Sequence, residues 1–141
     1  MELYNRLKNI LGRDNEEELI ESISTVRESL NGLVEERMCK VYSGFLLNEL
    51  RKRHVPARLI NTLDLGFDYE HIFILVPSNN KGYFLADLTF SQFNQKIEQL
   101  KQLLDTGYQL MDDTSFSCYF NVITKGKNTV LIPVENIFYK M

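Results

Sequence analysis

The spacing of hydrophobic residues changes near Pro56, and this change separates a helical first part of the chain from a remainder of β type. Before it, Leu19, Ile23 and Val26 recur at intervals of four and three residues, which predicts an amphipathic helix. After it, the apolar residues fall into short runs bounded by turn residues, as expected for strands. These runs are Arg58–Leu63, His71–Pro77 and Tyr83–Leu88. We therefore expect an α+β fold in which the helices come first and an antiparallel sheet follows.

The first part of the chain is expected to form three helices, one of which is central. A short helix over Leu3–Leu11 precedes Gly12, and a second helix opens at Asp14 in a variant of the capping box. Asn31-Gly32 then provides a C-terminal stop, so that residues 1–32 form an N-terminal helical segment. The third helix, Cys39–Arg53, has apolar residues on more than one face, which predicts a central helix packed on the sheet.

The remainder of the chain is expected to form strands, turns and one more helix. The run His71–Pro77 is apolar on both faces, which is typical of an interior strand, and the turn-forming stretch Ser78–Gly82 joins it to the next run. A fourth helix is predicted over Ser91–Leu104. Phe116–Thr124 and Thr129–Val134 are then predicted to form a second hairpin.

Length and composition favour one soluble globular domain over residues 1–141. The chain is 44% hydrophobic and 25% charged with a net charge of -3, so nothing global indicates nucleic acid or an acidic membrane surface as a partner. The apolar runs are far shorter than the roughly 20 residues of a membrane helix, and the N-terminus lacks the apolar region of a secretory signal. We expect a cytoplasmic protein, or one delivered by a secretion system that needs no signal peptide, with free thiols at Cys39 and Cys118.

Three polar residues are placed to form a catalytic triad. Two of them, His71 and Asp87, belong to neighbouring predicted strands. If the hairpin pairs Pro77 with Tyr83, both side chains lie on one face as diagonal neighbours, with their Cα atoms roughly 7–8 Å apart. The third residue, Cys39, begins the central helix, and a helix N-terminus and a nearby imidazole both lower the pKa of a thiol. We expect that helix to pack against the face that carries the histidine.

The stretch from Arg37 to Thr89 resembles the core of the transglutaminase-like superfamily, a branch of the papain-like cysteine enzymes. Members carry a cysteine that opens a helix ending in a Leu-Arg pair, and then a Gly-Ile-Pro-Ala-Arg-like stretch. A histidine two residues before an aromatic residue follows, and then an aspartate two residues before a threonine. The matching positions in this chain are Cys39, Leu50-Arg51, Val55-Pro56-Ala57-Arg58, His71 with Phe73, and Asp87-Leu88-Thr89. The chain departs from this pattern at His54, Phe73 and Leu88, where the family usually has glycine, tryptophan and proline.

The resemblance implies a papain- or transglutaminase-like catalytic core over residues 37–89. In such a core Cys39 would be the nucleophile, His71 the general base and Asp87 the orienting acid. The enzyme would be a cysteine hydrolase or acyltransferase, namely a protease, glutamine deamidase or transamidase that acts on an amide or thioester of a protein or peptide substrate. No cofactor is implied, and the oligomeric state stays open. The alternatives are a catalytically inactive binding module on the same fold and a biosynthetic peptidase that depends on a partner protein.

Some of these residues also allow other interpretations. Asp87 could form a salt bridge with Arg58 or Arg51, because a buried carboxylate needs a partner. Cys118 lies in an alternating apolar run and is expected to pack in the core. A zinc site is discounted because the available ligands fit no standard spacing. Those ligands would be Cys39, His54, His71 and Cys118.

Two further features keep their alternatives open. An oxyanion hole needs a second donor beside the N–H of Cys39, and Asn31 or a backbone group in Leu33–Met38 could supply it. The second helix carries glutamates on one face, which could recognise a basic partner, although a solvated acidic surface is the simpler interpretation.

Overall fold

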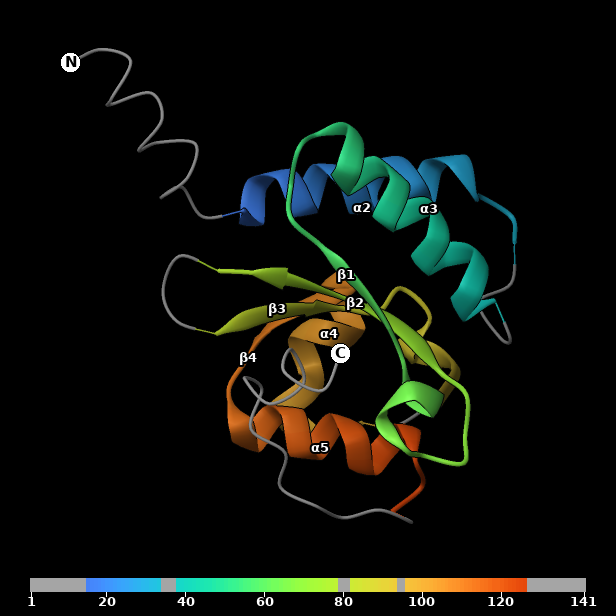
Figure 1. Cartoon of the computed structure of the whole chain (residues 1–141), viewed down its shortest axis with the longest axis vertical. Coiled ribbons are helices and arrows are strands. Elements are labelled where there is room, and N and C mark those ends of the chain that lie inside the picture. Colours follow the sequence, from blue (N-terminus) through green and yellow to red (C-terminus); the bar gives the residue numbers. More distant parts are fainter. Residues whose placement is uncertain (1–14, 34–37, 79–81, 94–95, 127–141) are drawn as a thin grey trace, which may run out of the picture.

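The computed structural model describes residues 15–33, 38–78, 82–93 and 96–126, which form an α+β fold (Figure 1). This part of the chain contains a four-stranded antiparallel sheet and four α-helices, numbered from α2 as in Figure 1. The expected helix over Leu3–Leu11, the residue Asp14 and the expected strand Thr129–Val134 lie outside the described residues. Within the described ranges, no helix is long and apolar enough to cross a membrane.

The elements up to residue 86 follow the predicted order. Two helices precede three strands, and the change from helix to strand falls near Pro56, as predicted. The bounds are Glu16–Ser29 for α2, Cys39–Lys52 for α3, Arg58–Asn61 for β1, Ile72–Pro77 for β2 and Tyr83–Ala86 for β3. A fourth strand, β4 (Tyr108–Met111), completes a sheet of order β1-β2-β3-β4.

The hairpin of β2 and β3 has the register that the sequence predicts. Pro77 lies opposite Tyr83, and the pairing runs from there to Ile74 opposite Ala86. β2 is buried along most of its length, because it pairs with a strand on each side and helices cover both of its faces. The prediction of an interior strand is therefore confirmed.

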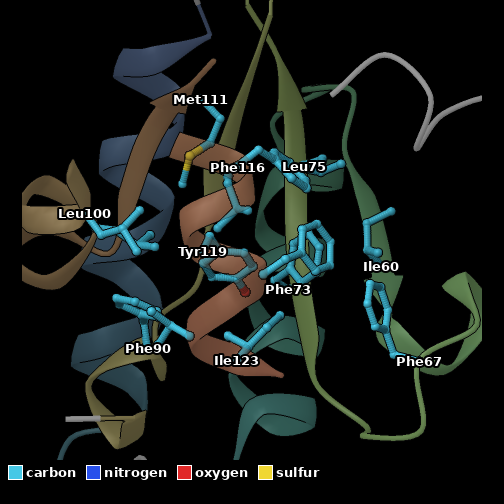
Figure 2. Packing of buried hydrophobic residues seen from close by; sticks show 14 residues of the cluster. Ile60, Phe67, Phe73, Leu75, Phe90, Leu100, Met111, Phe116, Tyr119 and Ile123 are labelled. Carbon is cyan, nitrogen blue, oxygen red and sulfur yellow. The ribbon is translucent and has the colours of Figure 1, made fainter. Parts of the chain in front are cut away.

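Helices cover both faces of this sheet (Figure 1). α2 and α3 lie against one face, where Ile74 and Val76 of β2 pack among their apolar side chains. The helix α5 (Asp113–Ile123) covers the other face, where Phe73 and Leu75 of β2 meet its aromatic residues (Figure 2). Alternate residues of one strand thus belong to two different hydrophobic clusters, as the period of two in a strand requires.

Helix α2 begins one residue later than the capping-box prediction placed it. Its N-cap is Asn15 instead of Asp14. The side-chain amide of Asn15 donates to the carbonyl oxygen of Pro77 at 2.9 Å. The start of α2 is therefore positioned by a bond to the end of β2, which the local sequence pattern does not reveal.

Helix α3 ends in a Schellman motif that has a histidine where glycine is usual. The N–H of Val55 donates to the carbonyl of Leu50 at 2.9 Å, and the N–H of His54 donates to that of Arg51 at 3.1 Å. His54 has a φ of 58°, in the left-handed region. That conformation costs a residue with a Cβ roughly 1–2 kcal/mol. His54 therefore introduces backbone strain at the end of α3.

Two predictions for the last part of the chain were wrong. In place of a helix over Ser91–Leu104, the structure has two 3₁₀ turns and a short α-helix. Their bounds are Phe90–Phe93 for η2, Glu98–Leu100 for η3 and Lys101–Thr106 for α4. In addition, the stretch Phe116–Thr124 is not a strand, because most of it belongs to α5.

The signals for α5 lie in its first residues and in its spacing. The side chain of Asp112, the N-cap, accepts a hydrogen bond from the N–H of Ser115 at 2.8 Å. The main buried residues recur at the intervals of three and four that mark a helix. They are Phe116, Tyr119, Phe120 and Ile123. Their aromatic character favours strands, but tertiary packing of a helical face overrides that preference.

Candidate active site

Cys39 is the first residue of α3, and its side chain is half-buried. Met38 is the N-cap residue, and the first turn of α3 carries no acidic side chain. The N–H groups of a first helical turn lack partners within the helix and form the positive end of the helix dipole. They therefore stabilise a negative charge on the sulfur of Cys39.

A short loop closed by Thr62 holds the backbone of His71. The hydroxyl of Thr62 accepts a hydrogen bond from the N–H of His71 at 2.8 Å and donates to the carbonyl of Tyr69. The N–H of Thr62 donates to the carbonyl of His71 at 2.9 Å. These bonds join the end of β1 to the start of β2, so that His71 is fixed immediately before its strand begins.

Asp87 lies beside His71, as the predicted register requires, and accepts hydrogen bonds on both oxygens. Nε2 of His71 lies 2.6 Å from Oδ2, and the hydroxyl of Tyr119 donates to that same oxygen at 2.8 Å. Oδ1 accepts from the N–H and from the hydroxyl of Thr89, each at 3.1 Å. The carboxylate is 2% exposed, and these partners satisfy it without the salt bridge to an arginine that the sequence left open.

The thiol of Cys39 contacts both the ring of His71 and the backbone of Ile72. It forms a hydrogen bond with the ring, and the N–H of Ile72 donates to the sulfur. One turn further along α3, the hydroxyl of Ser43 donates to the carbonyl oxygen of Ile72 at 3.1 Å. Successive residues of a strand direct their backbone groups to opposite sides. Thr62 therefore binds those of His71, while α3 binds those of Ile72.

The helix that carries Cys39 packs on the face of the sheet opposite to the predicted one. Its buried residues pack with Ile74 and Val76, whereas His71 faces Tyr119 of α5. The two layers meet because the pairing of β2 with β3 begins at Ile74, so that α3 can reach the backbone at the start of β2. The prediction treated the sheet as continuous and did not include this opening.

The surroundings of Cys39 and His71 shift both pKa values in the directions that favour an ion pair. Burial raises the pKa of Cys39, but the hydrogen bond and charge of His71 and the N–H of Ile72 outweigh it, so that this pKa lies below its ordinary value of 9.0. Burial lowers the pKa of His71, but the charge and hydrogen bond of Asp87, aided by Cys39, raise it from 6.5 to about 9. Both shifts favour transfer of the thiol proton to the imidazole.

Aromatic side chains cover part of the His71 ring. Phe93 contacts it edge-on with ring centroids 4.9 Å apart, and Tyr69 contacts Phe93 at 6.5 Å. Phe73, which stands where the transglutaminase-like pattern has tryptophan, is fully buried and belongs to the core. Tyr69 is 38% exposed. The aromatic surface near the site therefore comes from Tyr69 and Phe93, and not from the position that the family motif suggests.

The other candidates from the sequence lie apart from the triad. Cys118 is half-buried on α5 and packs against the core, as predicted. Among the residues that the structure describes, no group of three or more His, Cys, Asp or Glu side chains could hold a metal ion. Asn31 is exposed, and residues 34–37 lie outside the described ranges, so the second oxyanion donor stays a prediction.

The acidic face of α2 has a partner within the chain. Arg53, at the end of α3, contacts Glu18 at 3.2 Å and Glu21 at 2.7 Å. These ion pairs join the two helices that cover one face of the sheet. Part of the acidic face is therefore neutralised inside the fold, which weakens the interpretation of that face as a site for a basic partner.

Tyr119 is the residue of this cluster that the sequence reasoning missed. It lies in the stretch that was predicted to be a strand and belongs to no recognised motif. The available signal was its place in the helical stripe of α5, which directs it toward the sheet. A tyrosine in the middle of a buried stripe needs a partner for its hydroxyl.

Comparison of the chain with protein-family models, with curated proteins and with solved structures finds no match. The likeness to the transglutaminase-like superfamily therefore stays a resemblance of motifs. The geometry of Cys39, His71 and Asp87 is the remaining guide to function.

Proposed function

We propose that this chain is a cysteine hydrolase or acyltransferase with a Cys39–His71–Asp87 triad on a papain- or transglutaminase-like core. Its substrate is an amide or thioester of a protein or peptide. The observation that carries the proposal is the unbroken series of contacts from Asp87 through the His71 ring to a half-buried thiol at a helix N-terminus. Each contact is one that nucleophilic catalysis by cysteine requires.

The first half of the reaction forms an acyl-enzyme. Nε2 of His71 faces Asp87, which leaves Nδ1 to take the proton of Cys39. The thiolate attacks the substrate carbonyl carbon, and the backbone N–H of Cys39 donates to the resulting oxyanion. Collapse of this intermediate breaks the bond to the leaving amine or thiol, which takes the proton from the imidazolium. The acyl group then remains on the sulfur as a thioester.

The second half releases the acyl group. His71 takes a proton from water or from an amine, which attacks the thioester and frees the sulfur of Cys39. Water as acceptor gives proteolysis or glutamine deamidation, and an amine gives transamidation. Asp87 keeps the ring oriented and stabilises its charged form in both halves.

Alkylation with iodoacetamide tests the proposal, because the chain contains two half-buried cysteines that can be compared directly. We expect Cys39 to react at least about tenfold faster than Cys118 at about pH 6.5, since its thiolate is stabilised. His71→Ala should remove this advantage, whereas Cys118→Ala should leave the alkylation rate of Cys39 unchanged. Equal and slow labelling of both cysteines in the wild type would instead indicate an inactive binding module.

Intact mass spectrometry of candidate protein substrates then identifies the reaction. Deamidation raises the substrate mass by about 1 Da, proteolysis yields fragments, and transamidation adds the mass of the amine. Cys39→Ala is the control for each product. A product that forms equally with Cys39→Ala would contradict the assigned nucleophile.

A further inference from the structure

Tyr119 is buried in surroundings that would suit a phenylalanine. Its ring lies in the middle of the core beneath the sheet (Figure 2), and it is 0% exposed. The rings within contact distance include those of Phe73, Phe90, Phe116 and Phe120. Burial of a hydroxyl in such a place costs free energy unless the hydroxyl has a hydrogen-bond partner. Asp87 is the partner that Tyr119 has.

The hydroxyl of Tyr119 binds the oxygen of Asp87 that also receives His71. The two distances to Oδ2 are 2.8 Å from the hydroxyl and 2.6 Å from Nε2. Thr89, only two residues along the chain, binds the other oxygen, whereas Tyr119 comes from the distant helix α5. Donors on both oxygens fix the plane of the carboxylate, and hydrogen bonds to an ionised acceptor are the strong ones.

The hydroxyl keeps its proton throughout the working range of pH. Burial, and then the negative charge and hydrogen bond of Asp87, raise the pKa of Tyr119 well above 10. Tyr119 therefore acts as a donor to Asp87 and does not compete with it for the His71 proton. Its bond to Asp87 also ties α5, which lies outside the stretch that carries the family resemblance, to the triad.

We propose that Tyr119 is a positioning residue of the triad, whose hydroxyl holds the Asp87 carboxylate in the orientation that faces Nε2 of His71. It thereby helps to set the pH at which Cys39 becomes a thiolate. This inference rests on the proposed function, because it acts through the same ion pair.

The test is the pH profile of Cys39 alkylation in Tyr119→Phe, with Tyr108→Phe as the matched control. The hydroxyl of Tyr108 also donates to a carboxylate at 2.8 Å, that of Glu16, which is not part of the triad. Without the Tyr119 hydroxyl, the negative charges of the triad are less stabilised. The thiol of Cys39 therefore ionises at a higher pH. We expect the midpoint on the acid side to rise by about 0.5–1 pH unit in Tyr119→Phe and to stay in place in Tyr108→Phe.

The outcomes separate this inference from the proposed function. A wild-type Cys39 that reacts no faster than Cys118 overturns the proposed function. A second outcome is that wild-type Cys39 reacts fast, but the pH midpoint of its alkylation differs by less than about 0.2 pH unit between wild type and Tyr119→Phe. This outcome overturns the role of Tyr119 and leaves the triad intact. A purely structural tyrosine would lower the urea midpoint of unfolding without moving the pH midpoint.

A second variant covers the case in which Tyr119→Phe does not fold. Site-specific replacement of Tyr119 by 3-fluorotyrosine keeps the ring and the hydroxyl but makes the hydroxyl a stronger donor. The midpoint should then move to lower pH, the opposite of the phenylalanine variant. An unchanged or higher midpoint in this variant contradicts the proposal.

Discussion

Replacement of Cys39 by alanine should make the stability of the protein depend on pH, because it removes one half of a pair that shares a proton. Between about pH 6.5 and 8.5 the unfolded wild-type chain holds one proton on these two groups, at the thiol. We expect the folded chain to hold one as well, at His71, because the pKa of Cys39 is lowered and that of His71 is raised to about 9. Equal proton numbers predict a free energy of unfolding that is nearly constant in this range.

In Cys39→Ala the folded chain still holds a proton on His71, whereas the unfolded chain has released it. A raised pKa stabilises the fold fully below the unfolded value of 6.5, and this contribution is lost as pH rises toward the folded value. A rise from 6.5 to about 9 corresponds to about 3 kcal/mol, at about 1.4 kcal/mol for each pH unit. Cys39 itself supplies part of that rise in the wild type. We therefore expect the free energy of unfolding of Cys39→Ala to fall by about 2 kcal/mol between about pH 6.5 and 8.5.

Urea unfolding followed by circular dichroism at constant ionic strength measures this change. Cys118→Ala is the matched control and should be as insensitive to pH as the wild type. The double variant Cys39→Ala with Asp87→Asn should lose the slope, because Asp87 is the main cause that raises the pKa of His71. Parallel profiles for Cys39→Ala and the wild type would refute the shared proton, and with it the ion pair on which the mechanism depends.

Three further substitutions test other parts of the structure. His54→Gly should raise the free energy of unfolding by about 0.5–1 kcal/mol, because glycine adopts a φ of 58° without strain; an unchanged urea midpoint would contradict this. Ser43→Ala should slow the alkylation of Cys39 several-fold, because it removes the hydrogen bond that joins α3 to the start of β2. An unchanged rate would show that this hydrogen bond does not position Cys39. Asp112→Ala should cost about 1 kcal/mol near neutral pH. Backbone N–H groups lower the pKa of Asp112 below 3.8, so this cost should vanish as pH falls through that pKa, which calorimetry at low pH can check.

The hairpin and the relation of two triad residues could be predicted from the sequence because they depend on local rules. Turn residues between Pro77 and Tyr83 set the register, and the register decides which side chains share a face. His71 and Asp87 are therefore neighbours by the geometry of a single hairpin. Cys39 was assigned to the start of a helix by the same kind of local evidence, and α3 begins there.

Contacts between distant elements were not available to the same reasoning. The aromatic run of Phe116–Phe120 suits a strand or a buried helix face, and its role in covering the sheet decides between them. The partner of the Tyr119 hydroxyl depends on that outcome. In the same way, the face on which α3 packs depends on where the pairing of β2 with β3 stops, which no local pattern specifies.

The site depends on a sheet edge that stays open at one residue. Continued pairing of β2 with β3 would place Leu88 opposite Ile72 and would use the backbone groups that Cys39 and Ser43 bind. The pairing instead begins at Ile74. The N-terminal part of α3 therefore binds the backbone of Ile72, which β3 would otherwise bind. A nucleophile from one layer can therefore reach an imidazole in the other.

Gly107 contacts the chain at the point where the pairing of β2 with β3 has ended. The N–H of Asp87 donates to the carbonyl of Gly107 at 2.8 Å, which continues the pairing of β3 with β4 by one residue. Gly107 has a φ of 88°, and a Cβ at this position would lie 2.7 Å from the side chain of Leu88. The backbone conformation favours glycine, and a Cβ would in addition force the side chain of Leu88 to shift. The backbone of the residue that orients His71 is thus held by Gly107, the residue before β4, while the start of β2 stays open to α3.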